Sequence, residues 1–147
     1  MKQERKQIDL KNIRITDSLF GSYVKQVSEK MIPYQWKILN DQLKGAEKTY
    51  CIENFRIAAG EMEGTRKGVV FQDTDLYKWL ESVAYTIAGG NGSQFEPLAD
   101  EVIELIGRAQ EPDGYLNTYF TVNAPERKWK NLIEGHELYT SGHMIEA

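Results

Sequence analysis

The clearest pattern of apolar positions lies in the middle of the chain and predicts a helix over about residues 73–88. A single apolar stripe recurs there at three- and four-residue intervals, formed by Leu76, Trp79, Leu80, Val83 and Ile87. A second stripe predicts a helix over about 95–110, with Pro97 tolerated in its first turn. A glycine-rich turn at 89–92 joins the two helices, so we expect an antiparallel helical hairpin.

The N-terminal part of the chain predicts a polar tail and an extended segment, followed by a helix. Residues 1–7 are polar, and apolar and polar residues alternate after them, so 1–17 is expected to lie outside the helical domain. From about 20 to 40 the apolar residues recur at helical spacing. Pro33 interrupts this pattern and should kink or divide the helix, because proline lacks an N–H donor.

The remaining segments are shorter and complete a mainly helical pattern. Residues 51–59 can form a short helix, whereas the glycines and charges of 60–68 indicate a loop. The aromatic and β-branched stretch 115–122 favours an extended segment. A last helix is expected to begin near Asn131 or Glu134. The pattern therefore predicts a mainly α fold of about five helices.

Composition and charge exclude several function classes. The net charge of −4 argues against a nucleic-acid binder held by phosphate contacts. The single cysteine, Cys51, excludes an intramolecular disulfide framework and a four-cysteine zinc site, and we interpret it as a packed side chain. Apolar runs are too short to span a membrane, and the polar start carries no signal-like apolar segment. We therefore expect a cytoplasmic protein without a membrane partner.

Both histidines of the chain lie close to its C-terminal end. On a continuous helix, His136 and His143 would share one face, with Tyr139 and Thr140 between them. Such a face can present imidazoles and hydroxyls to a polar cavity; alternatively, one histidine packs or caps and the other is solvated. A zinc-protease motif is excluded, because it needs its second histidine at position 140, which is threonine.

Two carboxylates, Asp73 and Asp75, stand at the start of the central predicted helix. Because they are two residues apart, they point in different directions. Compensation of the helix dipole is enough to explain both, and an acid–base pair would need a separation set by its substrate. The later turn at Asp113-Gly114 is followed by Tyr115 and Asn117. That turn can line a sugar site or simply pack against the neighbouring helices.

Ordered stretches of the chain resemble the N-terminal part of the glycoside hydrolases of family 127, the β-L-arabinofuranosidases. In chain order the matching stretches are Ile32-Pro33-Tyr34-Gln35-Trp36, Asn40-Asp41, Asn54-Phe55-Arg56-Ile57-Ala58-Ala59-Gly60, Val70-Phe71-Gln72-Asp73-Thr74-Asp75, Lys78-Trp79-Leu80-Glu81, Ala109-Gln110, Asp113-Gly114-Tyr115-Leu116-Asn117-Thr118, His136-Glu137-Leu138-Tyr139, Gly142-His143 and Ile145-Glu146-Ala147. They cover most of residues 18–147, and together they are highly specific.

The resemblance implies an incomplete (α/α)6 barrel, with 18–147 forming the N-terminal portion of a catalytic domain truncated at its C-terminal end. It also implies hydrolysis of β-L-arabinofuranosides with retention. The family uses a zinc-bound cysteine nucleophile and a glutamate acid/base, and these residues and the zinc ligands would lie downstream of this chain. No catalytic residue, metal ligand or cofactor is therefore expected within it, although zinc is expected in a full-length relative. Cys51 does not match the nucleophile.

The residues carried over from the family are expected to bind substrate. His136 matches a substrate-contacting histidine, and Gln72, Asp73 and Asp75 match a shared motif. An arabinofuranoside-type carbohydrate is therefore the expected ligand.

Three functional hypotheses follow for the chain. The first is an N-terminal piece of a retaining glycoside hydrolase that is inactive alone, and the final segment, which begins a helix without a stop signal, agrees with it. The second is a non-catalytic module that binds a carbohydrate or a partner. The third is a non-functional product of a split or frameshifted gene. In the first case, an incomplete helical ring should expose apolar faces, and Trp36 and Trp79 should share one helical core.

Overall fold

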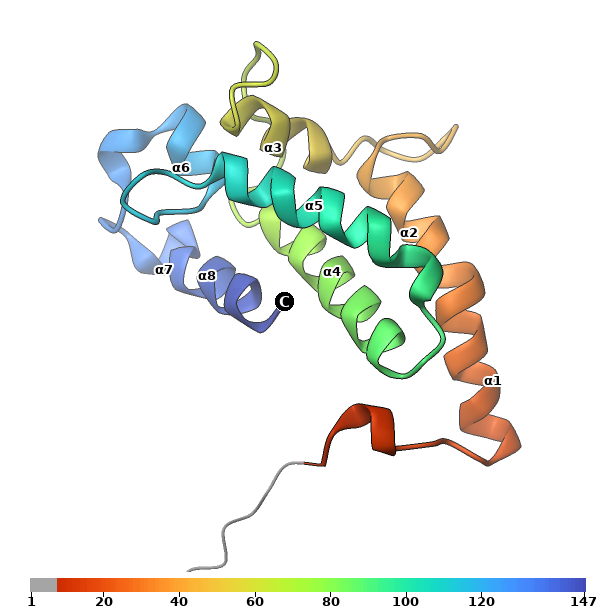
Figure 1. Ribbon diagram of the computed structural model, residues 1–147. Coiled ribbons are helices and arrows are strands. Elements are labelled where there is room, and N and C mark those ends of the chain that lie inside the picture. Colours follow the sequence, from red (N-terminus) through yellow and green to blue (C-terminus); the bar gives the residue numbers. More distant parts are fainter. Residues whose placement is uncertain (1–7) are drawn as a thin grey trace, which may run out of the picture.

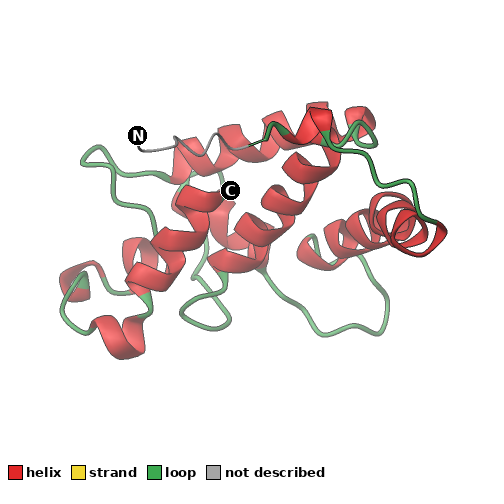
Figure 2. Cartoon of the chain, turned by 90° about the horizontal axis from the view of Figure 1, so that it is seen from below, coloured by secondary structure: helices red, strands yellow, loops and turns green. Residues whose placement is uncertain are grey.

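The structure is a computed structural model that describes residues 8–147, and within that range it consists of helices joined by loops (Figures 1 and 2). The predicted polar tail at 1–7 lies outside the described residues. The α-helices are α1 (Ser18–Gln26), α2 (Ile32–Leu39), α3 (Cys51–Ala58), α4 (Asp73–Ala88), α5 (Glu96–Ala109), α6 (Thr118–Asn123), α7 (Leu132–Gly135) and α8 (Glu137–Glu146). Short 3₁₀ turns are η1 (Leu10–Asn12), η3 (Ser93–Phe95) and η4 (Pro125–Arg127), and η2 (Val27–Met31) is a π-helix.

The segment 8–17, expected to be a tail with a short extended stretch, contains a helical turn at 10–12, whereas 13–16 is not helical and Ile13 has extended backbone. The turn η1 follows Asp9, whose side chain accepts a hydrogen bond from the backbone N–H of Lys11 at 3.3 Å. Helix α1 then starts behind Asp17, whose carboxylate accepts from the N–H of Phe20 at 2.8 Å. Aspartate side chains satisfy N–H groups that would otherwise be unpaired, and so favour helical starts over extended backbone.

No loop interrupts the chain at Pro33, but the α-helix is interrupted by a π-helix just before this residue, and only a kink stays untested. Helix α1 runs through the π-helix η2 directly into α2. At the junction the N–H of Ile32 bonds the carbonyl of Val27, five residues earlier. This wider turn comes immediately before Pro33. In a regular α-helix the ring of Pro33 would clash with the carbonyl four residues back. The sequence pattern could not reveal this solution, because π turns carry no distinct period.

Helices α4 and α5 form the predicted antiparallel hairpin and confirm the pattern of apolar residues. Helix α4 covers 73–88, as predicted, and Pro97 lies in the first turn of α5. The glycine at position 92 is required sterically, since a Cβ there would come within 2.6 Å of the backbone nitrogen of Ile87.

Helix α6 replaces the extended segment expected at 118–122. The side chain of Asn117 accepts hydrogen bonds from the N–H groups of Tyr119 (3.0 Å) and Phe120 (3.2 Å). This cap, together with the anchoring of Thr118 described below, outweighs the strand preference of the aromatic and β-branched residues. The turn before it is confirmed, with Gly114 in the left-handed region at φ +89°.

The helices pack around α4 (Figure 1). Helix α4 contacts α2 on one side and α8 on the other, and α3 and α5 pack against each other and against α4. The core around α4 consists of Ile32, Leu39, Cys51, Ile52, Phe55, Leu76, Tyr77, Trp79, Leu80, Val83, Phe95, Ala99, Val102, Leu105, Ala109 and Leu116. This arrangement brings the start of α4 beside the start of α8.

Trp79 and Trp36 meet in this core, as predicted. Trp79 is 2% exposed, Trp36 is partly buried against it, and their ring centroids lie 4.7 Å apart. The indole N–H of Trp79 donates to the backbone carbonyl of Ile32 at 3.1 Å. Helix α4 is thereby fixed to the beginning of α2 by both packing and a buried hydrogen bond.

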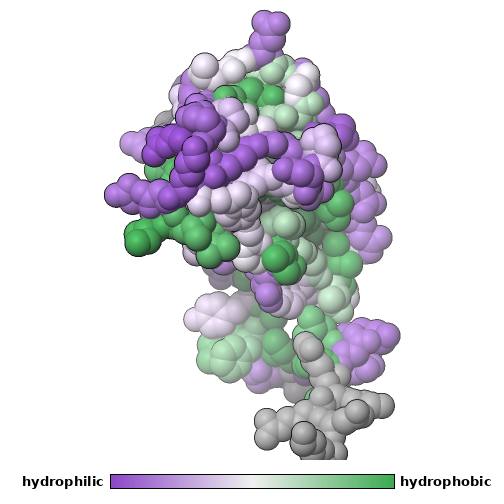
Figure 3. All heavy atoms as spheres, turned by 90° about the vertical axis from the view of Figure 1, so that its left-hand side faces the viewer, coloured by the Kyte–Doolittle hydropathy of each residue, from purple (hydrophilic) through white to green (hydrophobic). Residues whose placement is uncertain are grey.

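Apolar side chains remain uncovered on several helices, as expected for an incomplete ring. On α1 the exposed residues include Leu19, Phe20 and Tyr23, and on α8 Leu138 and Ile145 are 62% and 77% exposed. On the side of the molecule that carries α6 and α7, apolar groups also reach the surface among polar ones (Figure 3). Surfaces of this kind are typical of faces that pack against another element.

Candidate functional site

The starts of α4 and α8 bring four aromatic rings together from two distant parts of the sequence. We call this group, formed by Phe71, His136, Tyr139 and His143, the aromatic cluster. The ring centroids of Phe71 and His136 are 5.0 Å apart, those of His136 and Tyr139 are 6.2 Å apart, and those of Tyr139 and His143 are 4.7 Å apart. All three contacts are edge-to-face, which is a favourable arrangement for aromatic rings.

The backbone of His136 departs from the single helix face predicted for the two histidines. His136 has φ +51° and separates α7 from α8, so only His143 lies on the helix. Next to it, Gly135 is packed so closely that a Cβ would lie 3.0 Å from the ring of Phe120. The break turns the imidazole of His136 toward Phe71. The rings of both histidines nevertheless contact the ring of Tyr139, although His136 does not lie on the same helix.

Tyr139 is held in place by Lys78 of α4. The ammonium group of Lys78 donates to the hydroxyl of Tyr139 at 2.7 Å and lies 5.1 Å from the centre of its ring. The hydroxyl hydrogen of Tyr139 therefore stays available to donate to a ligand. An open groove of about 430 Å³ runs alongside, between α4 and α8. Its lining residues are Glu81, Leu138, Tyr139, Gly142, His143 and Glu146.

Gln72 and Asp75 form a hydrogen-bonded pair at the first turn of α4, next to Phe71. The amide of Gln72 donates to the carboxylate of Asp75, which is exposed. Partial desolvation raises the pKa of Asp75, and the nearby ammonium of Lys78 opposes this rise. The same lysine therefore connects the polar pair with the aromatic cluster.

Asp73 points the other way and is buried inside the protein. It is 1% exposed, and its two carboxylate oxygens accept from the backbone N–H of Thr118 at 2.7 Å and from its hydroxyl at 2.6 Å. The guanidinium of Arg66, which is also buried, lies 3.6 Å away. Burial raises the pKa of Asp73, while Thr118 and Arg66 oppose the rise. The expected divergence of Asp73 and Asp75 is confirmed, with only Asp75 facing solvent.

Glu137, which the sequence reasoning did not single out, fixes the start of α8 from inside. Its buried carboxylate accepts from the hydroxyl of Tyr115 at 2.5 Å and from the backbone N–H of Trp129 at 2.9 Å. Burial and this carboxylate raise the pKa of Tyr115. The adjacency of Glu137 to His136 in a matching motif was the available signal. Arg66 was missed because an arginine in a glycine-rich loop is usually solvated.

Cys51 is a packed side chain, as interpreted from the sequence. It is 1% exposed, and its thiol points to the backbone carbonyl of Gln72 at 3.9 Å. Burial, with Asp73 and Asp75 nearby, raises the pKa of the Cys51 thiol well above its ordinary value. A thiol in such surroundings stays protonated and does not act as a nucleophile.

The donor groups present do not assemble a zinc site. Across residues 8–147 no three side chains of histidine, cysteine, aspartate or glutamate come together in a way that can hold a metal ion. The ring of Tyr139 contacts the rings of both His136 and His143. Among the same residues, no helix is both long and apolar enough to cross a membrane.

Known proteins match the chain both in sequence and in structure. Residues 12–147 match the family model of the GH127 catalytic domain of β-L-arabinofuranosidases. The non-reducing end β-L-arabinofuranosidase of Bifidobacterium longum subsp. longum is 35% identical over an alignment 152 positions long, which covers 92% of this chain and 23% of that protein. The chain therefore spans about a quarter of the length of this relative.

Two solved structures share the fold of this chain. A GH127 β-L-arabinofuranosidase from Geobacillus stearothermophilus superposes with a TM-score of 0.89 at 52% identity, covering 92% of this chain and 21% of that one. A second GH127 β-arabinofuranosidase superposes with a TM-score of 0.80 at 30% identity, covering 95% of this chain and 22% of that one. The mainly α fold, an incomplete (α/α)6 barrel, is thus confirmed. The chain belongs to the GH127 β-L-arabinofuranosidase family and corresponds to the N-terminal part of its catalytic domain.

Proposed function

We propose that the chain supplies one wall of the sugar site of a retaining β-L-arabinofuranosidase and does not catalyse hydrolysis by itself. The proposal rests on one observation. The aromatic cluster lies beside Gln72 and Asp75, where the starts of α4 and α8 are close together. Segments some 60 residues apart in the sequence build this surface, and two of the stretches that resemble the family, 70–75 and 136–139, lie on it.

The side chains on this wall suit a neutral, polyhydroxylated ring. The amide of Gln72 and the carboxylate of Asp75 can bond sugar hydroxyls, and the hydroxyl of Tyr139 can donate a further bond. The rings of Phe71 and His136 can pack against the C–H groups of a sugar. An arabinofuranoside, the substrate named for the relatives, has this mixture of hydroxyl groups and C–H faces.

We assign Asp73 a positioning role in this wall rather than a direct contact with sugar. Its carboxylate is fully engaged by Thr118 and lies beside Arg66, inside the protein. These bonds tie the start of α4 to the start of α6. The first turn of α4, which presents Gln72 and Asp75, is thereby held in one orientation.

The proposed lack of activity follows from the chemistry that retaining hydrolysis requires. A nucleophile and an acid/base group must face each other across the bond that is broken. Cys51 is buried with a raised pKa, so it does not supply the nucleophile. We propose that both groups, and the ligands of a zinc ion, come from other sequence in a full-length relative.

Binding of a substrate fragment tests the wall directly. Titration of the ¹⁵N-labelled chain with methyl β-L-arabinofuranoside, followed by NMR, should shift signals of His136, Tyr139 and Asp75. Substitution of His136→Ala or Asp75→Asn should weaken binding by about fivefold or more, the equivalent of one hydrogen bond. The control Asp100→Asn removes an exposed carboxylate on α5, outside the wall, and should leave binding unchanged. Unchanged spectra at tens of millimolar ligand would remove the proposal.

A second candidate is a carbohydrate-binding module without catalysis. It is favoured by the completeness of the aromatic cluster within this chain, since its four rings contact one another without any outside element. Calorimetry separates the two functions. Submillimolar affinity of the isolated chain for an arabinoside favours the module, whereas binding in the millimolar range or weaker agrees with one wall of a larger site.

A further inference from the structure

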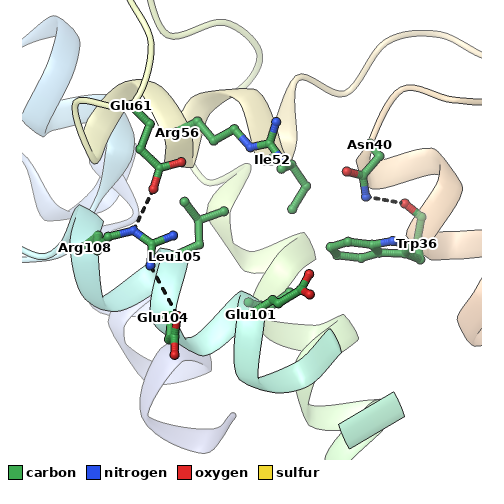
Figure 4. A pocket seen from close by; sticks show the side chains of 10 residues that line it. Trp36, Asn40, Ile52, Arg56, Glu61, Glu101, Glu104, Leu105 and Arg108 are labelled. Atoms are coloured by element: carbon green, nitrogen blue, oxygen red, sulfur yellow. Dashed lines mark hydrogen bonds and ion pairs between the residues drawn. The ribbon is translucent and has the colours of Figure 1, made fainter. Parts of the chain in front are cut away.

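A second cleft, of about 190 Å³, opens between α2, α3 and α5 (Figure 4). It shares no residue with the aromatic cluster or with the groove beside it. Its volume is below the roughly 300–1,000 Å³ that is usual for drug-sized ligands, so it fits one small ring. Figure 4 shows side chains from all three helices turned toward the same space.

The apolar part of the cleft is formed mainly by the aromatic ring of Trp36, which packs against a neighbouring ring. The indole of Trp36 projects from α2 into the space, with Ile52 and Leu105 beyond it (Figure 4). Its other neighbour is Trp79, whose ring is tilted by 34° at a centroid distance of 4.7 Å. Because Trp79 is itself buried and hydrogen-bonded, the position of Trp36 is fixed before any ligand arrives.

The polar part of the cleft contains both engaged and available groups. Arg108 pairs with Glu61 at 2.6 Å and with Glu104 at 3.6 Å. Arg56 and Glu101 line opposite sides of the cleft, and neither forms an ion pair with any of residues 8–147 (Figure 4). One available positive group and one available negative group thus face a fixed aromatic surface.

This combination selects for one chemical class of ligand. The two groups without an ion-pair partner among residues 8–147, Arg56 and Glu101, carry one charge of each sign, and both can form strong hydrogen bonds to hydroxyl groups. An aromatic face takes up the C–H side of a sugar ring. We propose that the cleft binds a single pentose ring, with its C–H face on Trp36 and its hydroxyl groups bonded to Arg56 and Glu101. The site is separate from the wall proposed above.

NMR on the ¹⁵N-labelled chain tests the cleft through the indole N–H signal of Trp36, assigned with the variant Trp36→Phe. L-Arabinose and D-xylose are the probes. Addition of either sugar should shift this signal in a saturable way at millimolar concentrations. Glu101→Gln and Arg56→Gln, both surface substitutions, should each weaken the effect by about fivefold. Circular dichroism of each variant checks that the helices are retained.

Two control variants separate this proposal from others. Asp100→Asn changes the neighbouring carboxylate on α5, which does not line the cleft, and should leave the titration unchanged. His136→Ala alters the other site and should also leave the Trp36 signal responsive. A Trp36 signal that stays unshifted at tens of millimolar sugar overturns the proposal. So does a shift that persists equally in Glu101→Gln and Arg56→Gln, or one that His136→Ala abolishes.

Discussion

The hydroxyl of Thr118 is the centre of a buried polar network, and its removal tests the packing that positions the wall. It donates to Asp73 at 2.6 Å and accepts from the guanidinium of Arg66 at 3.2 Å. The three residues are 1%, 1% and 4% exposed for Thr118, Asp73 and Arg66. The substitution Thr118→Val keeps the shape of the side chain and leaves one charged acceptor and one charged donor without this partner.

The expected cost follows from these two bonds. A hydrogen bond to a charged group contributes roughly 1.5–3 kcal/mol, and buried groups left unpaired cannot turn to water. We therefore expect Thr118→Val to lower the free energy of unfolding by about 3 kcal/mol or more. For a chain of this size that corresponds to a fall in Tm of roughly 6–12 °C.

Urea unfolding followed by circular dichroism measures the effect. The matched control is Thr65→Val, the same change at an exposed residue beside Arg66, which should stay within about 0.5 kcal/mol of the parent chain. A loss below about 1 kcal/mol in Thr118→Val, or an equal loss in both variants, would refute the reasoning.

The pH dependence of this cost has a definite sign. Burial raises the pKa of Asp73, and the hydrogen bonds of Thr118 oppose that rise. In Thr118→Val the pKa of Asp73 in the folded state should therefore increase further. The folded variant then holds a proton to higher pH than the folded parent chain does. The cost is largest at neutral pH and shrinks as the pH falls through the range where Asp73 is protonated.

Three further changes probe other parts of the fold. Glu111 accepts from Lys128 and Thr121, which lower its pKa, so Glu111→Gln should cost about 1 kcal/mol at pH 7, and the difference should vanish by acid pH in urea unfolding. Gly107→Ala in α5 meets no atom within 4 Å and should raise stability by about 0.5–1 kcal/mol, seen as a higher Tm. Trp79→Phe removes the buried bond to Ile32 and should cost about 2 kcal/mol in the same assay; a neutral result would contradict its anchoring role.

The sequence predicted the parts of the fold that depend on one helix face. The stripe from Leu76 to Ile87 and the glycine-rich turn after it located α4, and the two-residue spacing of Asp73 and Asp75 correctly implied different directions. Their destinations were not predictable, because the burial of Asp73 depends on Thr118, 45 residues later.

The features that the pattern missed all depend on specific local bonds. The cap formed by Asn117 turned a strand-like stretch into α6, and a single π turn, not a loop, precedes Pro33. The left-handed backbone at His136 split the last helix into α7 and α8. Apolar periodicity does not register such single-residue events, although each of them shapes the approach to the candidate site.

Exchange into a working enzyme is the most direct measurement of the central claim. The matching region of the Geobacillus stearothermophilus GH127 enzyme, 52% identical to this chain, would be replaced by residues 12–147. The account predicts that the chimera hydrolyses 4-nitrophenyl β-L-arabinofuranoside and that His136→Ala within it lowers kcat/KM at least tenfold, or about 1.4 kcal/mol. A folded chimera without activity would contradict the claim that this chain forms a sugar-binding wall. A chimera whose kcat/KM is unchanged by His136→Ala would contradict it as well.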